Sequence, residues 1–433
     1  MPFTVGVYTL GCKVNQYESE AIAEALEKEG FCVCDPAQVC DVYIINTCTV
    51  TAESDRKSKQ FIRRALSENP NAKIIVTGCL AQVAPEKVSS IKGVAYVCGS
   101  RNKMSCVEAA KKLVNSDSID TLIDVNDTDS LPFECMEIKK FPRTRAYIKI
   151  EDGCESHCTY CIIPRARGKI CSKSPSDVLC EIESLAFDGC REVVLTGIET
   201  ASYGIDLDNY RLCDLLKDAD SLVKGKVRIR LGSLDPSLMK PKFIEKIAPL
   251  TSLAPHFHLS MQSGSDRILA KMKRKYNTKM AYDGISLLRE AIPGVQLTTD
   301  IITAFPSESE EDFNLTKDFL QKTEFLNAHI FTYSRRDGTL AAAMPEQIPA
   351  SVGKARTSEL IACQKDITAK ILSANVGKEF PVLFETDSNG FSVGHTPSFI
   401  EVKVKSDTEL HSQIHNVKIE GIVDGCAEGF IIQ

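Results

Sequence analysis

The sequence lacks the features of a membrane-spanning or exported protein. No apolar run approaches the roughly 18 residues that a membrane-spanning helix requires. The first residues, Met-Pro-Phe-Thr-Val, lack the basic start of a signal peptide. We therefore expect a cytoplasmic protein without a membrane partner. No heptad repeat or unexplained apolar stripe indicates an oligomeric state.

The chain also has little net charge. Its 52 lysines and arginines against 58 acidic residues give −6 over 433 residues, which excludes a tail-driven nucleic-acid binder. With 43% hydrophobic and 25% charged residues, wholesale disorder is excluded as well. An anionic partner must therefore bind at local basic patches. Three stretches without acidic residues qualify: Lys139, Lys140, Arg143 and Arg145; Arg165, Arg167, Lys169 and Lys173; and Lys271, Lys273, Arg274, Lys275 and Lys279.

Cysteine, in contrast, is abundant. The chain has 18 cysteines and no export signal that would favour disulfides. In a reducing compartment such thiols are either small buried hydrophobic side chains or ligands of soft metals. Twelve of them show no ligand-like grouping, so we interpret these as core residues. The other six fall into two groups of three.

The first group follows the strands of a predicted parallel sheet. Apolar runs at 3–10, 42–46 and 73–77 alternate with helical patterns at 16–28 and 52–67, which is typical of βαβ units. Each run is followed by a cysteine, and the carboxyl ends of parallel strands share one edge of a sheet. The thiols are expected to converge on an iron–sulfur cluster or a catalytic metal with an open position, unless they are merely buried. These cysteines are Cys12, Cys48 and Cys79.

After a polar linker, the strand–helix alternation resumes six times. The helices have capping signals at Ser174-Pro175 and at the Ser-Glu-Ser-Glu sequence of 307–310. Six units are fewer than the eight of a closed barrel, so we predict an open (β/α)6 partial barrel with room for a large substrate. The expected strands are 146–150, 192–196, 226–231, 256–261, 296–303 and 329–333.

A connecting helix at 351–374 leads to a change of pattern. Short alternating strands at 380–385, 398–405, 416–423 and 429–433 predict a small all-β module. Small barrels of this kind often bind nucleic acid, although a stabilising cap is the alternative. We therefore expect an α/β protein with four parts: a parallel α/β domain at 1–115, a linker at 116–140, the partial barrel at 141–372 and the β module at 373–433.

The second group of cysteines lies after the first barrel strand, where barrel active sites are built. Its pattern is Cys154-x3-Cys158-x2-Cys161. Three thiolates on one loop are suited to a [4Fe–4S] cluster, with the fourth iron open to another ligand. The competing interpretation is zinc with His157 as the fourth ligand. Adjacent residues such as His157 and Cys158 usually point apart, which argues against zinc.

This motif, with an aromatic residue at Tyr160, resembles that of the radical S-adenosylmethionine enzymes. Together with the upstream cysteines and the downstream β module, the chain resembles the methylthiotransferases over almost its whole length. The segment Thr9-Leu-Gly-Cys-Lys-Val-Asn-Gln-Tyr-Glu18 is similar to the MtaB type. The branches that act on isopentenyladenosine or on a ribosomal protein read Gly-Cys-Gln-Met-Asn or Gly-Cys-Pro-Lys-Asn there. Segments 194–198, 259–265 and 333–339 also resemble the MtaB type.

The resemblance implies an enzyme that methylthiolates C2 of N6-threonylcarbamoyladenosine at position 37, in the anticodon loop of tRNA. It implies two [4Fe–4S] clusters: one cleaves S-adenosylmethionine to a 5′-deoxyadenosyl radical, and the other carries the sulfur. S-adenosylmethionine is then both radical source and methyl donor, and an electron donor such as flavodoxin or ferredoxin is needed. Candidate S-adenosylmethionine contacts are Tyr160, Thr196, Gly197, Ser233 and Gln262.

Two alternatives to this function stay open. One is a methylthiotransferase that acts on another tRNA adenosine or on a ribosomal protein side chain. The other is a non-enzymatic electron carrier or zinc-dependent RNA-binding protein. Within the resemblance, Ala304-Phe-Pro-Ser307 replaces the usual Gly-Phe-Pro-Gly, and Glu199-Thr200-Ala201 replaces His-Leu-Gly. Because glycine tolerates positive φ, Ala304 and Ser307 leave the local backbone conformation in question.

Overall fold

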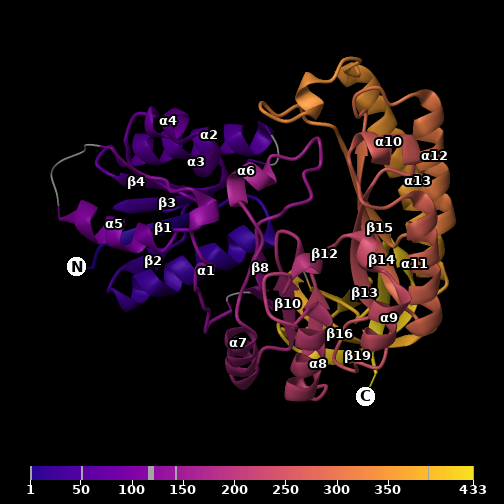
Figure 1. The fold of residues 1–433 in the computed structure, drawn as a ribbon. Coiled ribbons are helices and arrows are strands. Elements are labelled where there is room, and N and C mark those ends of the chain that lie inside the picture. The colour runs from indigo at the N-terminus through magenta and orange to yellow at the C-terminus, as the bar shows by residue number, and fades with distance from the viewer. Residues whose placement is uncertain (1, 50–51, 116–120, 142–143, 389, 433) are drawn as a thin grey trace.

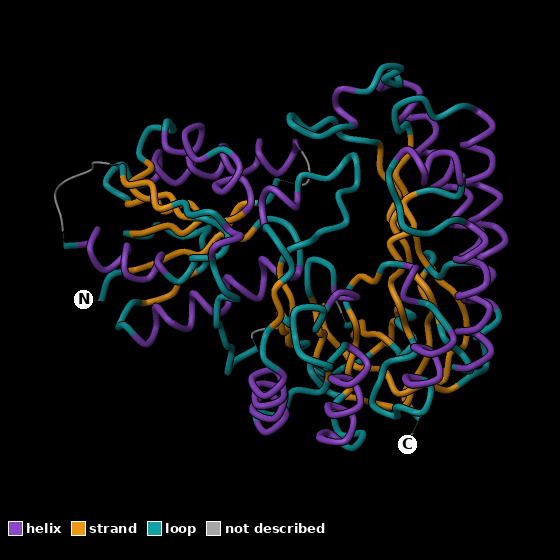
Figure 2. Tube along the Cα trace, viewed as in Figure 1, coloured by secondary structure: helices purple, strands orange, loops and turns teal. Residues whose placement is uncertain are grey.

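The chain forms a parallel α/β domain, an open barrel and a small β-barrel, arranged as Figure 1 shows. The computed structural model describes residues 2–49, 52–115, 121–141, 144–388 and 390–432, with the backbone alone at 52–55. Figure 2 shows strands enclosed by helices in the first two parts and a strand-rich third part. No helix among the described residues is long and apolar enough to cross a membrane.

The N-terminal sheet has six parallel strands in the order β2-β1-β3-β4-β5-β6. Helices α1 and α5 pack on one face, and α2 packs on the other. The predicted parallel α/β architecture is confirmed, but three short strands escaped prediction, one of them from the expected linker. The elements are β1 (Thr4–Thr9), α1 (Lys13–Lys28), β2 (Cys32–Cys34), β3 (Val42–Thr47), α2 (Ala52–Glu68), β4 (Lys73–Gly78), α3 (Cys79–Val83), α4 (Pro85–Ser89), β5 (Val94–Cys98), α5 (Ser105–Val114) and β6 (Leu122–Asp124).

The central part is the predicted partial barrel. Its parallel strands form two sheets, β11-β10-β7 and β12-β13-β14-β15, and among the described residues β7 and β15 do not pair with each other, which leaves the barrel open. All six predicted strands are present, and β12 is additional. The strands are β7 (Ala146–Lys149), β10 (Glu192–Thr196), β11 (Arg228–Leu231), β12 (Ser233–Leu234), β13 (His256–Gln262), β14 (Gln296–Thr303) and β15 (Asn327–Thr332), with a short pair of β8 (Glu151–Asp152) and β9 (Cys171–Ser172).

Helices cover the outside of this barrel, as Figure 1 shows. The predicted cap at Ser174 is confirmed, since its side chain accepts a hydrogen bond from the Asp177 amide. The cap predicted at Ser307 is wrong: Ser309 caps the helix and forms a capping box with Asp312. The helices are α6 (Ile163–Arg167), α7 (Pro175–Phe187), α8 (Leu212–Val223), α9 (Pro241–Ile247), α10 (Asp266–Lys271), α11 (Thr278–Ala291), α12 (Glu310–Thr323) and α13 (Ala350–Ser373).

The C-terminal part is a closed barrel of five strands around its own apolar core. Four strands were predicted, and β17 was missed because Phe391-Ser-Val-Gly-His395 is short and follows β16 almost directly. Closure pairs β16 with β19 and β18 with β20, so no strand edge is left open. The strands are β16 (Glu379–Ser388), β17 (Phe391–His395), β18 (Glu401–Lys405), β19 (Ile414–Val423) and β20 (Cys426–Ile431).

A fully buried charge cluster joins the first domain to the barrel. The Glu18 carboxylate on α1 accepts hydrogen bonds from Lys103, from Lys149 Nζ at 2.9 Å and from Arg167 Nη1 at 2.7 Å. Although burial alone would raise the pKa of Glu18, the Arg167, Lys103 and Lys149 cations hold it well below its ordinary value. Lys149 and Arg167 also pair with Asp152. This network fixes α1 against the first barrel strand.

We expect Glu18→Ala to lower the free energy of unfolding by about 3–5 kcal/mol, because it leaves buried cations without their shared carboxylate. Urea denaturation provides the measurement. The matched control is Glu27→Ala on the same helix, whose pair with Lys140 is exposed; it should cost less than about 1 kcal/mol. Equal losses in the two variants would contradict the assigned role of Glu18.

Candidate active site

The structure brings the first three cysteines to one edge of the N-terminal sheet. Cys12 and Cys48 follow the adjacent strands β1 and β3, and Cys79 begins α3 directly after β4. The registers Thr9↔Asn46 and Thr47↔Gly78 align these strand ends. The convergence expected from the sequence is thus present in the backbone.

Gly11 allows two of these thiols to come close. It has φ +107°, and a Cβ built on it would lie 2.7 Å from Cys48 Cβ and 2.9 Å from Cys48 Sγ. Any side chain here would therefore displace Cys48. Gly78, with φ +96°, allows the end of β4 to approach β3 closely just before Cys79, because a Cβ there would clash with the Thr47 backbone. Glycine at both positions follows from this close packing of strand ends.

Asn15 and Arg167 hold this edge in place. The Asn15 amide, fully buried, donates to the Leu10 carbonyl at 2.6 Å and to the Thr47 carbonyl at 3.1 Å. Arg167 reaches across from the barrel: its Nε lies 3.3 Å from Cys79 Sγ, and its Nη2 donates to Asn15 Oδ1 at 2.6 Å. One side of the cysteine edge thus belongs to the barrel domain.

The second cysteine group lies on the loop after β8. The Cys154 amide donates to the Gly168 carbonyl at 3.0 Å, the Cys161 amide donates to the Cys158 carbonyl at 3.0 Å, and Arg274 Nη1 lies 3.0 Å from Cys158 Sγ. Burial, with the nearby Glu199 and Cys158, raises the pKa of Cys154 to about 11. Burial, with the neighbouring Cys158 and Cys154 thiols, raises the pKa of Cys161 to about 12. The three thiols therefore lie near one another, and the Arg274 guanidinium faces one of them.

The spacing of the thiols distinguishes a site for a single metal ion from a site for an iron–sulfur cluster. Among the residues that the structure describes, no group of three or more His, Cys, Asp or Glu side chains is close enough to hold a single metal ion. His157 is thus not placed with the three thiols in such a group. A [4Fe–4S] cluster binds each thiolate at a different iron, so it needs a wider spacing than a tetrahedral zinc site with bonds of about 2.3 Å. Two sets of three soft donors, each with an arginine beside one thiol, fit that group.

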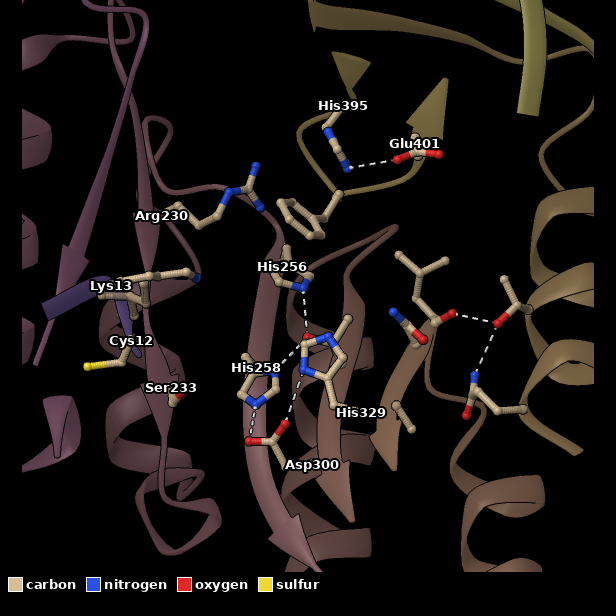
Figure 3. Close-up of a pocket in the computed structure, with 18 of the residues that line it drawn as sticks. Cys12, Lys13, Arg230, Ser233, His256, His258, Asp300, His329, His395 and Glu401 are labelled. Atoms are coloured by element: carbon tan, nitrogen blue, oxygen red, sulfur yellow. Dashed lines mark hydrogen bonds and ion pairs between the residues drawn. The ribbon is translucent and has the colours of Figure 1, made fainter. Parts of the chain in front are cut away.

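A chamber of 1220 Å³ lies between the start of α1, the strands of the open barrel and the C-terminal barrel. Four predicted site residues line it: Cys12, Thr196, Gly197 and Ser233. Thr196 ends β10 and Gly197 follows it, and Ser233 lies two residues after the end of β11, so the three lie at the carboxyl ends of the neighbouring strands β10 and β11. Figure 3 shows Cys12 and Ser233 on one wall of the chamber, opposite a group of histidines.

The other predicted contacts lie outside this chamber. Gln262 ends β13 with φ +63° and is 8% exposed. Tyr160 packs against an apolar cluster that includes Met272 and Phe305. Burial raises the pKa of Tyr160 well above its ordinary value. The structure thus brings three of the five candidate S-adenosylmethionine contacts together and leaves two in the barrel wall.

Two predicted tRNA patches include side chains that are buried. Arg167 is engaged by Glu18 and Cys79, and Lys173 pairs with Glu181 inside the protein. Arg274 pairs with Asp235 at 2.7 Å besides contacting Cys158. Arg145 pairs with Glu192 and Glu385, and Arg143 lies outside the described residues. The exposed members are Lys139, Lys140, Arg165, Lys169, Lys273, Lys275 and Lys279.

Ala304 and Ser307, which replace the usual glycines, adopt the backbone conformation that glycine favours. Both residues have positive φ, +55° and +65°. The side chain of Glu308, bonded to the Ala304 amide at 2.9 Å and to Arg356, holds this turn. Glu199 is half-buried at the other departure, and desolvation with the nearby Asp235 raises its pKa to about 7.

Comparison with known proteins agrees with the fold and the cysteine pattern. Residues 148–320 match the radical SAM superfamily, and residues 4–99 match a family described as uncharacterized protein family UPF0004. The radical S-adenosylmethionine methyltransferase TsrM from Kitasatospora setae, with cobalamin and a [4Fe–4S] cluster bound, has a similar fold. Its TM-score is 0.60 at 17% identity, over 79% of this chain and 77% of that one. The fold and the matched segment define a radical S-adenosylmethionine protein.

Two curated relatives show to which family of radical S-adenosylmethionine proteins the chain belongs. The threonylcarbamoyladenosine tRNA methylthiotransferase MtaB of Bacillus subtilis is 36% identical over 96% of this chain and 93% of its own length. The protein of the same name from Thermotoga maritima is 37% identical over 97% and 96%. The chain belongs to the methylthiotransferase family, and within it to the MtaB type.

We expect Gly11→Ala to halve the iron content of the reconstituted protein, from about eight to about four atoms per chain, because the new Cβ displaces Cys48. The loop that carries Cys158 is untouched, so cleavage of S-adenosylmethionine should persist. Iron analysis and quantification of 5′-deoxyadenosine provide the measurements.

Gly30→Ala is the matched control. Gly30 has φ +86° in the same domain but has nothing within 4 Å of a built Cβ. It therefore carries the backbone strain without the clash, and its iron content should equal that of the wild type. A full iron content in Gly11→Ala would show that the close approach of Gly11 and Cys48 is not needed for the site.

Proposed function

We propose that this chain transfers a methylthio group to C2 of N6-threonylcarbamoyladenosine at position 37 of tRNA. Relatives of that name match it over nearly its whole length. The proposal depends on one observation: the chain has two groups of three cysteines, one in each of two domains that the buried Glu18 cluster joins. One trio lies at the edge of the first sheet and the other in the loop after β8, each with a buried arginine beside one thiol.

The cofactors are two [4Fe–4S] clusters and S-adenosylmethionine. Bound together, they supply a radical that abstracts a hydrogen from a carbon no side-chain base deprotonates at neutral pH. The thiolates that would hold the clusters are Cys154, Cys158 and Cys161 for one, and Cys12, Cys48 and Cys79 for the other. Hydrogen bonds to cluster sulfurs tune the reduction potential, so Arg274 and Arg167 would each set one potential.

For S-adenosylmethionine, we assign Thr196, Gly197 and Ser233 in the chamber, with Tyr160 and Gln262 from the barrel wall. Gly197 passes directly over Glu151, and a Cβ there would lie 2.6 Å from Glu151 Oε2. The same oxygen accepts the Glu199 amide at 2.7 Å, which fixes the β10 loop. A small residue at 197 thus keeps this wall of the chamber close to the cysteine loop.

The remaining features of the proposal concern partners and organisation. We assign residues 1–115, 141–372 and 373–433 to separate domains, with a linker at 116–140 between the first two, whose β6 adds to the first sheet. An electron donor such as flavodoxin or ferredoxin would reduce the cluster, and the enzyme would act in the cytoplasm. The five-stranded barrel and the exposed lysines beside the cysteine loop are the elements available to hold tRNA.

We expect Cys158→Ala to abolish formation of 5′-deoxyadenosine, because the loop then offers only two thiolates. Cys48→Ala should leave that cleavage intact and stop thiolation of tRNA. The assay is anaerobic, with reconstituted protein and tRNA that already bears the threonylcarbamoyl group, and mass spectrometry of the nucleosides reads the product.

The outcomes separate the proposal from its alternatives. Persistent cleavage in Cys158→Ala would remove the assignment of that loop. A wild-type enzyme that leaves threonylcarbamoyladenosine unchanged but modifies another adenosine, or a ribosomal protein, would place the chain with another branch of its family. An iron-free preparation would instead favour an RNA-binding role.

The exposed lysines give a separate prediction about tRNA binding. Lys273→Ala with Lys275→Ala should weaken tRNA binding and reduce the slope of log K against log salt by about 0.7–0.9 for each phosphate that the variant no longer neutralises. The double variant Lys217→Ala with Lys242→Ala, at exposed positions on α8 and α9, is the control and should bind as the wild type does. Unchanged salt dependence in the first variant would exclude this surface.

A further inference from the structure

One end of the chamber is lined by polar side chains, two of which carry a nitrogen with no hydrogen-bond partner among the described residues. Arg230, His256 and Lys13 all line this end, and Figure 3 shows them facing the same space. They come from three separate elements: β11, β13 and the start of α1. Electrostatic coupling links Lys13 with Arg230, and both with His256, so the three groups are neighbours.

Arg230 is the most constrained of the three. Its side chain is 2% exposed, and Nε and Nη2 donate to the Glu192 carboxylate at 2.6 and 3.1 Å. The guanidinium lies 4.8 Å from the centre of the Phe399 ring of the C-terminal barrel. Its Nη1, however, has no hydrogen-bond partner among the described residues. A buried guanidinium nitrogen without a partner carries a desolvation cost that a ligand oxygen would remove.

His256 repeats this pattern on the neighbouring wall. It is 5% exposed, its Nε2 lies 3.1 Å from Thr298 Oγ1, and its ring stacks on Phe399 at 4.6 Å. Its Nδ1 has no hydrogen-bond partner in the part of the chain that the structure describes. The ring is thus fixed from two sides at the chamber wall, with one buried nitrogen left without a partner.

Lys13 completes the group from the side of the cysteine edge. It follows Cys12, and Figure 3 shows that the two side chains point in opposite directions, with the Lys13 ammonium in the chamber. The charged groups that act on it are Arg230 and Arg145, which are positive, and Glu192 and Asp300, which are negative.

The acidic groups near Lys13 are already engaged by other side chains. Glu192 is fully buried and pairs with three arginines: Arg145, Arg228 and Arg230. Asp300 pairs with His258 at 3.1 Å and with His329 at 3.3 Å. Three arginines thus share the Glu192 carboxylate, and this positive charge, together with the unpaired nitrogens of Arg230 and His256, suits an anionic oxygen ligand.

We propose that Lys13, Arg230 and His256 form a subsite for the carboxylate of the threonyl group on the substrate adenosine. The inference rests on the proposed function, since it names the part of that substrate which the subsite reads. The N6 substituent ends in a carboxylate, and the chamber extends from Cys12 and Ser233 to these donors without a break. A dimethylallyl substituent would leave them unpaired, so the subsite selects against a hydrocarbon group.

The test compares two anticodon stem-loops in binding to the reconstituted enzyme. One carries N6-threonylcarbamoyladenosine, and the other carries the same group with its carboxylate replaced by a carboxamide. The wild type should bind the acid about 10- to 100-fold more tightly than the amide, in line with a hydrogen-bonded charged group. Lys13→Gln should lose most of this difference, and Lys13→Arg should keep most of it.

Lys322→Gln, in the last turn of α12 and exposed, is the control and should behave as the wild type does. Iron content and cleavage of S-adenosylmethionine should be unchanged in Lys13→Gln, which separates loss of the subsite from loss of the neighbouring cluster. Should that variant fail to assemble, the wild-type comparison of acid with amide decides alone. Equal wild-type affinities, with methylthiolation of threonylcarbamoyladenosine intact, overturn the subsite alone; absence of that product overturns the proposed function.

Discussion

The Glu18 carboxylate is the interaction on which the arrangement of the site depends. A buried charge is stable only when paired, and the partners of Glu18 come from three places in the chain: Lys103 between β5 and α5, Lys149 on β7 and Arg167 at the end of α6. Because Arg167 also contacts Cys79 and Asn15, the pairing that joins the domains also places the cysteine edge against the barrel. Domain placement and site geometry are thus set by one cluster.

The two cysteine groups have two features in common although their local structures differ. In each, backbone geometry brings the thiols close and a buried arginine faces one of them. Gly11 and Gly78 provide the close approach in the sheet edge, where each strand end touches the next. The loop after β8 instead relies on Gly153, where a Cβ would meet the Lys169 backbone and Arg101. The arginines supply positive charge in surroundings where a cluster bound by thiolates brings negative charge.

The C-terminal barrel closes the other end of the chamber. Phe399, with φ +72°, projects from it and stacks between His256 and His395 at 4.6 and 4.5 Å. Arg145 and Arg230 lie against the same ring. Such strain in a residue without glycine's freedom persists only where the surrounding contacts hold it. The barrel therefore shapes the chamber as well as offering a surface to RNA.

Local features of the protein follow from its sequence alone: the two cysteine patterns, the strand–helix alternation and the change to short strands near the C-terminus. Short strands such as β2, β5, β6 and β17 were missed because a few residues carry little periodicity. Which basic residues face solvent depends instead on tertiary packing. Arg167 and Arg274 are indistinguishable from surface residues in sequence, since their partners lie 88 and 116 residues away at Cys79 and Cys158. Lys13 likewise acquires its surroundings from segments that meet only after folding.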